Sequence, residues 1–212
     1  MLYFKQMDVV ILIQNIELKG ILEIPQGAEG LVIFAHGTGS GRLSERNQFV
    51  ATGLNNLGIG TLLFDLLSQE EERVMEKRFD IEALTERLIA VTKWCMENEN
   101  TKKLRLGYFG ASTGGAAALS AAAYWGTKIK AVVCRGGRPD LAMEVLDLIE
   151  SPTMLIVGGE DKQVIELNKL AYQKIGALKK MEIIPGATHL FEEPGALEKV
   201  LDLAGLWLAK YL

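Results

Sequence analysis

Cysteine, histidine and proline are scarce in this chain of 212 residues, and their scarcity excludes several classes of protein. The two cysteines, Cys95 and Cys134, are far apart, which gives neither a disulfide framework nor C-x-x-C spacing. Together with only two histidines, His36 and His189, they are too few for a four-ligand soft metal site. Five prolines and no Gly/Ser-rich run leave no candidate linker, so we expect one domain over residues 1–212.

An excess of basic charge and long apolar runs are also missing. The 23 Lys and Arg residues face 27 Asp and Glu residues, for a formal net charge of −4. Without surplus positive charge we expect no binding of nucleic acid. The apolar run nearest the start, Val9–Ile13, is shorter than the roughly 7–15 residues of a signal-peptide core. No run approaches the ~20 residues of a membrane span, so we expect a cytoplasmic protein without membrane association.

Short apolar runs alternate with helical periodicities along most of the chain. Runs such as LVIFA and TMLIVG are apolar throughout, which is typical of parallel strands covered on both faces. We predict strands over Val9–Gln14, Glu17–Ile24, Leu31–Ala35, Gly60–Asp65, Leu104–Phe109, Ile129–Arg135, Thr153–Val157 and Lys180–Ile184. We predict helices over Ser44–Leu57, Asp80–Glu97, Thr113–Trp125, Leu141–Ile149, Val164–Ile175 and Pro194–Tyr211. This order predicts an α/β fold with a mostly parallel, doubly covered sheet of about eight strands that begins with a hairpin.

The strongest motif is the G-x-S-x-G sequence Gly110-Ala111-Ser112-Thr113-Gly114, placed between a predicted strand and a predicted helix. The glycines permit a tight turn that lifts the Ser112 hydroxyl above the sheet edge. The Thr113 N–H then lies at the helix start, where it can bind the negative oxygen that develops in acyl transfer. The motif predicts Ser112 as a nucleophile. The alternative is a glycine-rich turn in which Ser112 caps the helix.

A serine hydroxyl needs a base to act as a nucleophile, and the chain offers two histidines. His189 follows the last strand and is our candidate, whereas we expect His36 to bond backbone groups as a structural residue. The acid that holds the imidazole has to follow a strand. We predict Asp161, with Asp140 and Glu160 as second choices. The alternative for Asp161 is a helix N-cap.

Backbone donors and arginines lie close to the predicted nucleophile. The glycine-rich turn after the third strand predicts the Thr38 N–H as a second donor to the developing oxyanion. Arg42 and Arg46 follow that turn, and Arg135 and Arg138 end the sixth strand. Because guanidinium groups suit carboxylates, we predict that one of them, Arg42 or Arg135, binds an anionic group of the substrate. The alternative is an ion pair with Asp140, Glu45 or Glu160.

Six stretches resemble the dienelactone hydrolase family of the α/β-hydrolase superfamily, over nearly the whole chain: FAHGTGSGRLSERN, TLLFDLL, LGYFGASTGGAAAL, CRGGRPDL, PTMLIVGGED and PGATHLFEEPG. The resemblance implies the α/β-hydrolase fold, a nucleophile at Ser112, an acid at Asp161 and a base at His189. It also implies oxyanion donors at Thr38 and Thr113. The hydrolases that named the family use a cysteine nucleophile, so the serine here favours a general serine esterase.

The sequence thus predicts a hydrolase that cleaves small carboxylic esters or lactones through an acyl-enzyme, without metal or cofactor. Only residues 136–151 separate the sixth and seventh strands, so we expect no cap domain and an open site. A non-catalytic binding or sensor protein, an acyltransferase and a perhydrolase remain alternatives, and the oligomeric state stays open. A short-chain dehydrogenase is disfavoured because Tyr124 would lie roughly 16 Å along the helix from Ser112.

Overall fold

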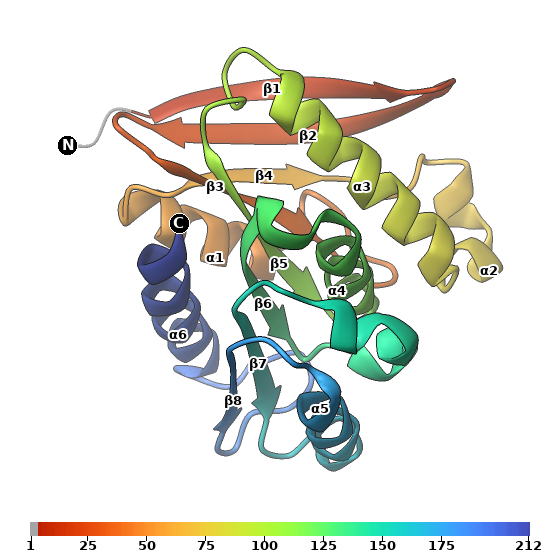
Figure 1. Ribbon diagram of the computed structural model, residues 1–212, viewed down its shortest axis with the longest axis vertical. Coiled ribbons are helices and arrows are strands. Elements are labelled where there is room, and N and C mark those ends of the chain that lie inside the picture. The colour runs from red at the N-terminus through yellow and green to blue at the C-terminus, as the bar shows by residue number, and fades with distance from the viewer. Residues whose placement is uncertain (1–3) are drawn as a thin grey trace.

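A single eight-stranded sheet runs through the computed structural model, which describes residues 4–212 (Figure 1). The strands are β1 (Phe4–Ile13), β2 (Ile16–Pro25), β3 (Gly30–Ala35), β4 (Gly60–Phe64), β5 (Arg105–Ala111), β6 (Ile129–Arg135), β7 (Thr153–Gly158) and β8 (Lys179–Ile184). Their spatial order is β1-β2-β4-β3-β5-β6-β7-β8. β2 pairs antiparallel with β1 and β4, and the other pairs are parallel.

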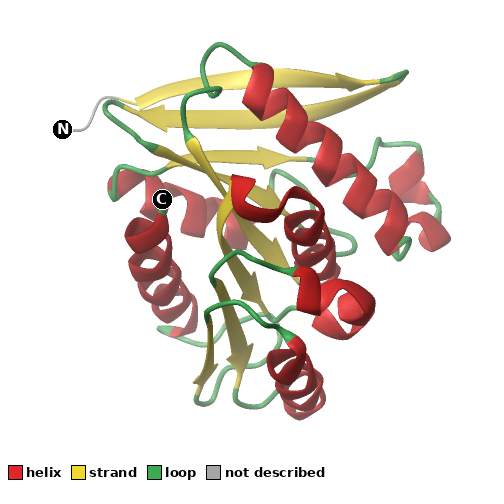
Figure 2. Cartoon of the chain, viewed as in Figure 1, coloured by secondary structure: helices red, strands yellow, loops and turns green. Residues whose placement is uncertain are grey.

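Helices cover both faces of this sheet (Figures 1 and 2). The α-helices are α1 (Glu45–Asn56), α2 (Met75–Arg78), α3 (Ile81–Glu97), α4 (Thr113–Trp125), α5 (Lys162–Lys174) and α6 (Ala196–Tyr211). The 3₁₀ helices are η1 (Glu71–Arg73), η2 (Gly126–Lys128) and η3 (Pro139–Leu148). α1 and α6 pack on one face, and α3, α4, η3 and α5 pack on the other. No helix in the described part of the chain is long and apolar enough to span a membrane.

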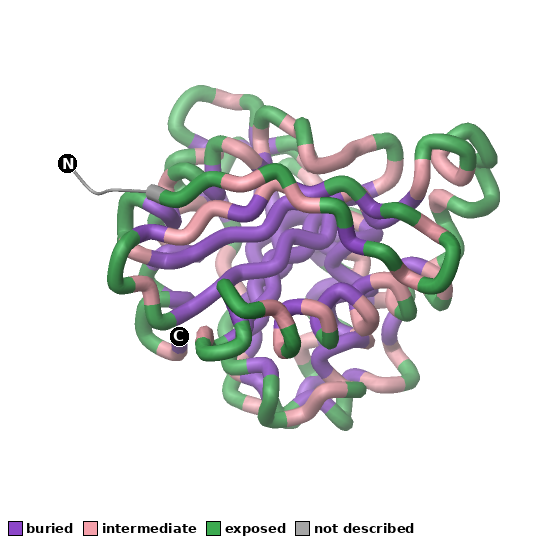
Figure 3. Tube along the Cα trace, turned by 90° about the horizontal axis from the view of Figure 1, so that it is seen from above, coloured by how far each residue is buried: buried purple, intermediate pink, exposed green. Residues whose placement is uncertain are grey.

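The central strands of the sheet are buried (Figure 3). All six residues of β3 and all six of β7 are buried, as are all five of β4. One core cluster fills the side of α1 and α6, and the larger one fills the side of α3 and α4. α4 is rich in alanine, and these small side chains let the helix lie close to the middle of the sheet. The N-terminal end of α4 is thereby held at the sheet edge.

The predicted fold class, with eight strands and alternating helices, is confirmed. Three details differ. The first strand begins at Phe4, before the apolar run that predicted it, because it pairs with β2 over its whole length. The segment after β6 is the 3₁₀ helix η3, with a kink at Ala142, where we predicted an α-helix. The short helices η1 and α2 were not predicted, since neither buries a residue and so neither has apolar periodicity.

Candidate active site

Ser112 occupies a sharp turn between β5 and α4. Its backbone has φ 51° and ψ −122°, a left-handed conformation that costs on the order of 1–3 kcal/mol for a non-glycine residue. Gly114 permits this turn, because a Cβ there would lie 2.1 Å from the carbonyl oxygen of Ala35. Gly37 faces the serine directly, since a Cβ on it would lie 2.9 Å from Ser112 Cβ. The strained turn and the glycines around it hold the Ser112 hydroxyl at the carboxyl edge of the sheet.

The structure brings Ser112, His189 and Asp161 together, although they follow three different strands. His189 Nδ1 lies 2.6 Å from Asp161 Oδ2, and His189 Nε2 lies 3.4 Å from Ser112 Oγ. The Asp161 carboxylate can only accept, so Nδ1 carries the proton and donates it. In this tautomer Nε2 presents its lone pair to the serine hydroxyl. This arrangement suits removal of the hydroxyl proton.

The alternatives for the acidic residue do not fit this geometry. Asp161 stands at the N-cap position of α5, yet its side chain makes no capping hydrogen bond. Both oxygens of Asp140 accept from Arg138, at 2.8 Å each. Glu160 lies 3.9 Å from Lys162 and is largely exposed. Asp161 is thus the carboxylate that faces His189.

His36 is bound to backbone on both sides, as we expected of a structural residue. Its Nδ1 donates to the Gly37 carbonyl at 2.9 Å, and its Nε2 accepts from the Leu66 N–H at 2.9 Å. Burial lowers the pKa of His36, against the hydrogen bond to Gly37 and the nearby charges of Asp65 and Glu72. The imidazole joins the turn after β3 to the chain after β4, and no nitrogen is left for proton transfer.

The predicted oxyanion donor on Thr38 already has an acceptor. The Thr38 N–H donates to Thr113 Oγ1 at 3.0 Å, and Thr38 Oγ1 donates to the Arg78 carbonyl at 3.2 Å. The two hydroxyls are 3.1 Å apart, so Thr113 Oγ1 must donate to Thr38 Oγ1. The Thr38 N–H could therefore serve an oxyanion only if that oxyanion replaced Thr113 Oγ1 as its acceptor. The Thr113 N–H stands in the first turn of α4, where N–H groups lack an intrahelical acceptor.

The arginines near the site differ in their partners. Arg42 binds Asp65 through its guanidinium and, at 2.8 Å, through its backbone N–H. Arg42 thus has a carboxylate within the chain, which favours the ion-pair alternative over substrate binding, although the partner is Asp65 and none of the three acids we considered. Arg138 is paired with Asp140 in the same way. Each of these two guanidinium groups thus has a carboxylate partner within the chain.

Arg135 is the exception among these arginines. It is 7% exposed, and its Nη2 reaches only Asn47 Oδ1, at 3.5 Å. Its Nε and Nη1 are buried without a hydrogen-bond partner in the described part of the chain. The Phe191 ring lies 5.7 Å from its Cζ. Burial, and then the charge of Arg46, lower the pKa of Arg135 to about 10.

Two residues around Arg135 were not predicted. Asn47 is 2% exposed on the inner face of α1, beside the buried Val50, Ala51 and Leu54. Asn47 lies three and four residues before Val50 and Ala51, on the same helix face. A polar residue on an otherwise apolar face indicates a buried polar contact, and this pattern is visible in the sequence. Phe191 is buried and has a left-handed φ of 58°, for which no pattern in the sequence gave a signal.

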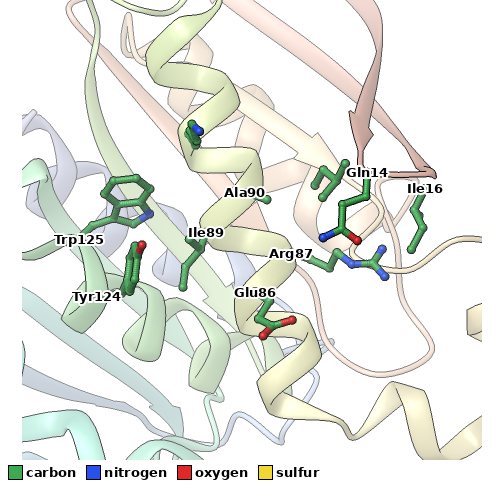
Figure 4. Close-up of a pocket in the computed structure, with 10 residues that line it drawn as sticks. Gln14, Ile16, Glu86, Arg87, Ile89, Ala90, Tyr124 and Trp125 are labelled. Carbon is green, nitrogen blue, oxygen red and sulfur yellow. The ribbon is translucent and has the colours of Figure 1, made fainter.

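A cavity of about 520 Å³ lies next to the oxyanion turn, lined by residues 38–46 and Asp65. A second cavity of about 520 Å³ lies between the β1–β2 hairpin, α3 and α4 (Figure 4). Tyr124 and Trp125, which line the second one, stand at the far end of α4, about 16 to 18 Å along the helix from its first residue, Thr113. Of these two cavities the first adjoins the turn that holds Thr38, and neither is lined by Ser112, His189 or Asp161.

Comparisons with known proteins agree with the fold. A family model described as an alpha/beta hydrolase domain matches residues 28–202. The crystal structure of dienelactone hydrolase from Anabaena variabilis ATCC 29413 has 50% sequence identity and a TM-score of 0.96, and the match covers 99% of each chain. Est1E from Butyrivibrio proteoclasticus shares the fold at 18% identity, with a TM-score of 0.83 over 96% of this chain and 98% of that one.

The chain therefore belongs to the α/β-hydrolase superfamily. Within it, the chain is a member of the dienelactone hydrolase-like family, and it has a serine, Ser112, in the turn between β5 and α4. Two relatives from Mycobacterium tuberculosis, each named "Putative phosphoribosyl transferase", are 50% identical over 205 residues, which are 97% of this chain and 46% of theirs. The chain thus spans about half the length of the curated relatives it matches, so their name describes a longer protein.

Proposed function

We propose that this protein is a serine hydrolase that cleaves small carboxylic esters or lactones through an acyl-enzyme on Ser112. The observation that carries the proposal is the hydrogen-bonded path from Asp161 through His189 to the serine of the strained turn. The esterases and dienelactone hydrolases among the similar structures support the same class of reaction.

The reaction follows from the positions of three side chains. His189 Nε2 takes the hydroxyl proton as Ser112 Oγ attacks the ester carbonyl. The Asp161 carboxylate stabilises the imidazolium that forms, and the imidazolium then protonates the departing alcohol. A water molecule, deprotonated by His189, attacks the acyl-serine and releases the acid. Atoms and charges balance without a cofactor.

Two backbone N–H groups stabilise the tetrahedral intermediate in this proposal. The Thr113 N–H is aligned with the dipole of α4, which favours a negative charge. The Thr38 N–H becomes the second donor when the oxyanion replaces Thr113 Oγ1 as its acceptor. The short segment between β6 and β7, which holds only η3, leaves the site open to small acyl groups.

Trapping of the acyl-enzyme tests the proposal. The protein is mixed with 4-nitrophenyl acetate, quenched in acid during turnover and digested for peptide mass measurement. We expect an acetyl group on the peptide that contains Ser112, and loss of turnover in Ser112→Ala but not in Ser120→Ala, a control on the same helix. Turnover that survives Ser112→Ala, or an acetyl group elsewhere only, contradicts the proposal.

A further inference from the structure

The outer sides of α1 and α6 carry exposed apolar side chains that lie close together. The two helices pack side by side on one face of the sheet (Figure 1). Leu206 of α6 is 75% exposed, the largest fraction of any large apolar side chain in the described part of the chain. Leu57 and Phe49 of α1 are exposed as well. Apolar side chains gathered in one exposed place indicate a surface that binds another molecule.

An apolar groove with a volume of about 580 Å³ runs between the two helices. Gly53 and Gly205 let the helices approach each other there. A Cβ on Gly205 would lie 2.7 Å from Leu57 Cδ1, and a Cβ on Gly53 would overlap the side chain of Leu201. Leu206 lines the same groove. An apolar side chain that packs beside Leu206 therefore also enters the groove.

The charges on α6 are arranged symmetrically about Leu206. Asp202 lies four residues before it and Lys210 four residues after it, so the three side chains share one helix face. Both charged residues are exposed, and neither forms an ion pair with another of residues 4–212. If two copies of α6 cross in antiparallel orientation with Leu206 on a two-fold axis, Asp202 of each copy faces Lys210 of the other. The helix face is thus complementary to itself, as a contact between identical subunits requires.

We propose that the outer sides of α1 and α6 join two copies of this chain in a symmetric dimer. The two α6 helices meet at the axis, and the α1 helix of each copy flanks the contact. Burial of the exposed leucines stabilises the dimer, and the two charge pairs fix the antiparallel register. The surface consists of Phe49, Gly53, Leu57, Asp202, Leu206 and Lys210.

This surface lies away from the candidate active site. Leu212, at the end of α6, contacts the start of β3, since a Cβ on Gly30 would lie 2.6 Å from Leu212 Cβ. The second half of α6 is therefore at the amino edge of the sheet, whereas Ser112 is at the carboxyl edge. The dimer leaves both candidate sites open, so the inference does not depend on the proposed function.

Reversal of the charges on α6 tests the proposed contact. We expect the wild type to sediment as a dimer at micromolar concentration. Asp202→Lys and Lys210→Asp each place like charges opposite each other twice, and each should raise the dimer Kd about 10- to 100-fold. The double variant that carries both changes restores opposite charges and should return the Kd close to that of the wild type. Lys169→Asp reverses a charge on α5, on the other face of the sheet, and should leave the Kd unchanged.

A cysteine placed on the two-fold axis tests the register directly. In Leu206→Cys the two new thiols of a dimer lie opposite each other, and the oxidant diamide should remove their hydrogens and form one disulfide bond between the copies. Cys95 and Cys134 are buried, so they do not compete. Leu170→Cys replaces a leucine of α5 that is 55% exposed, and it should give no cross-linked dimer on a non-reducing gel.

Three results would overturn the dimer contact. The first is a wild type that sediments as a monomer throughout the micromolar range. The second is a dimer whose Kd does not respond to the single charge reversals, or is not restored in the double variant. The third is a Leu206→Cys protein that cross-links no more than Leu170→Cys, because the copies would then meet at another surface. None of these results depends on whether Ser112 forms an acyl-enzyme.

Discussion

His36 follows β3 and His189 follows β8, so both imidazoles lie at the carboxyl edge of the sheet. His36 is 5% exposed, and its two ring nitrogens are used by backbone groups. The side chain of His189 is 38% exposed, and its nitrogens face a carboxylate and a hydroxyl. The same residue type thus joins two loops in one place, and in the other it lies where the proposed reaction needs a base. The partners of each ring, rather than its position at the edge, separate the two roles.

Replacement of each histidine by glutamine gives the largest test of this difference. His189→Gln should lower kcat for 4-nitrophenyl acetate by roughly 10⁴- to 10⁶-fold, because the hydroxyl loses its base. His36→Gln should stay within about tenfold of the wild type, since its contacts are to backbone. Steady-state kinetics measures kcat for both variants, after circular dichroism has shown that each is folded. A loss of kcat of similar size in both variants would contradict the different roles given to the two histidines.

The next largest effect is expected at the carboxylate beside His189. Asp161→Asn should lower kcat by roughly 10³- to 10⁴-fold, since an amide no longer fixes the tautomer or stabilises the imidazolium. Asp140→Asn, which disturbs only the pair with Arg138, serves as the matched control and should change kcat no more than a few fold. Equal effects of the two changes would remove Asp161 from the proposed mechanism.

Thr113 links the His36 turn to the serine turn, through its hydroxyl and Thr38. Thr113→Val keeps the shape of the side chain but removes the acceptor that positions the Thr38 N–H. We expect kcat to fall about tenfold with little change in KM, and Thr113→Ser to restore it. A lower KM with unchanged kcat in Thr113→Val would indicate that the hydroxyl only blocks the oxyanion position.

The smallest expected effect is on stability and its dependence on pH. The folded state resists protonation of His36, whose pKa burial lowers, while an unfolded histidine titrates near pH 6.5. Below that pH the unfolded chain binds the extra proton, so the free energy of unfolding falls as the pH falls, by at most about 1.4 kcal/mol per pH unit for one group.

Urea unfolding at pH 7.5 and pH 5.5 measures this contribution. His36→Gln should be less stable than the wild type at pH 7.5, and the difference between the two proteins should shrink at pH 5.5. A constant difference at the two pH values would show that His36 is not held neutral by its surroundings.

Much of the fold was predictable because its signals are local. Leu31–Ala35 is apolar at every position, as a strand covered on both faces requires, and it lies within β3. Ser112 was predictable for a similar reason, since the turn is encoded by five consecutive residues. His189 was a candidate because the chain has only two histidines, and Asp161 because it follows a buried strand.

The contacts that could not be predicted from the sequence join segments that only folding brings together. The hydrogen bond from the Thr38 N–H to Thr113 Oγ1 joins residues 75 positions apart. Arg42 pairs with Asp65, because the turn after β3 lies beside the end of β4, whereas the acids we considered were chosen by nearness in sequence or by motif. Arg135 Nε and Nη1 lack a partner among residues 4–212 because of the elements packed around them, so no pattern within β6 alone could show it.

The central claim is that the surroundings of Ser112 activate its hydroxyl, and intact-protein mass after treatment with a fluorophosphonate tests this without a choice of substrate. An activated serine attacks phosphorus, fluoride leaves, and the protein gains one phosphonyl group. The account predicts one adduct on the wild type and on Ser120→Ala, and none on Ser112→Ala. Folded wild-type protein that gains no adduct, or Ser112→Ala protein that gains one, would contradict it.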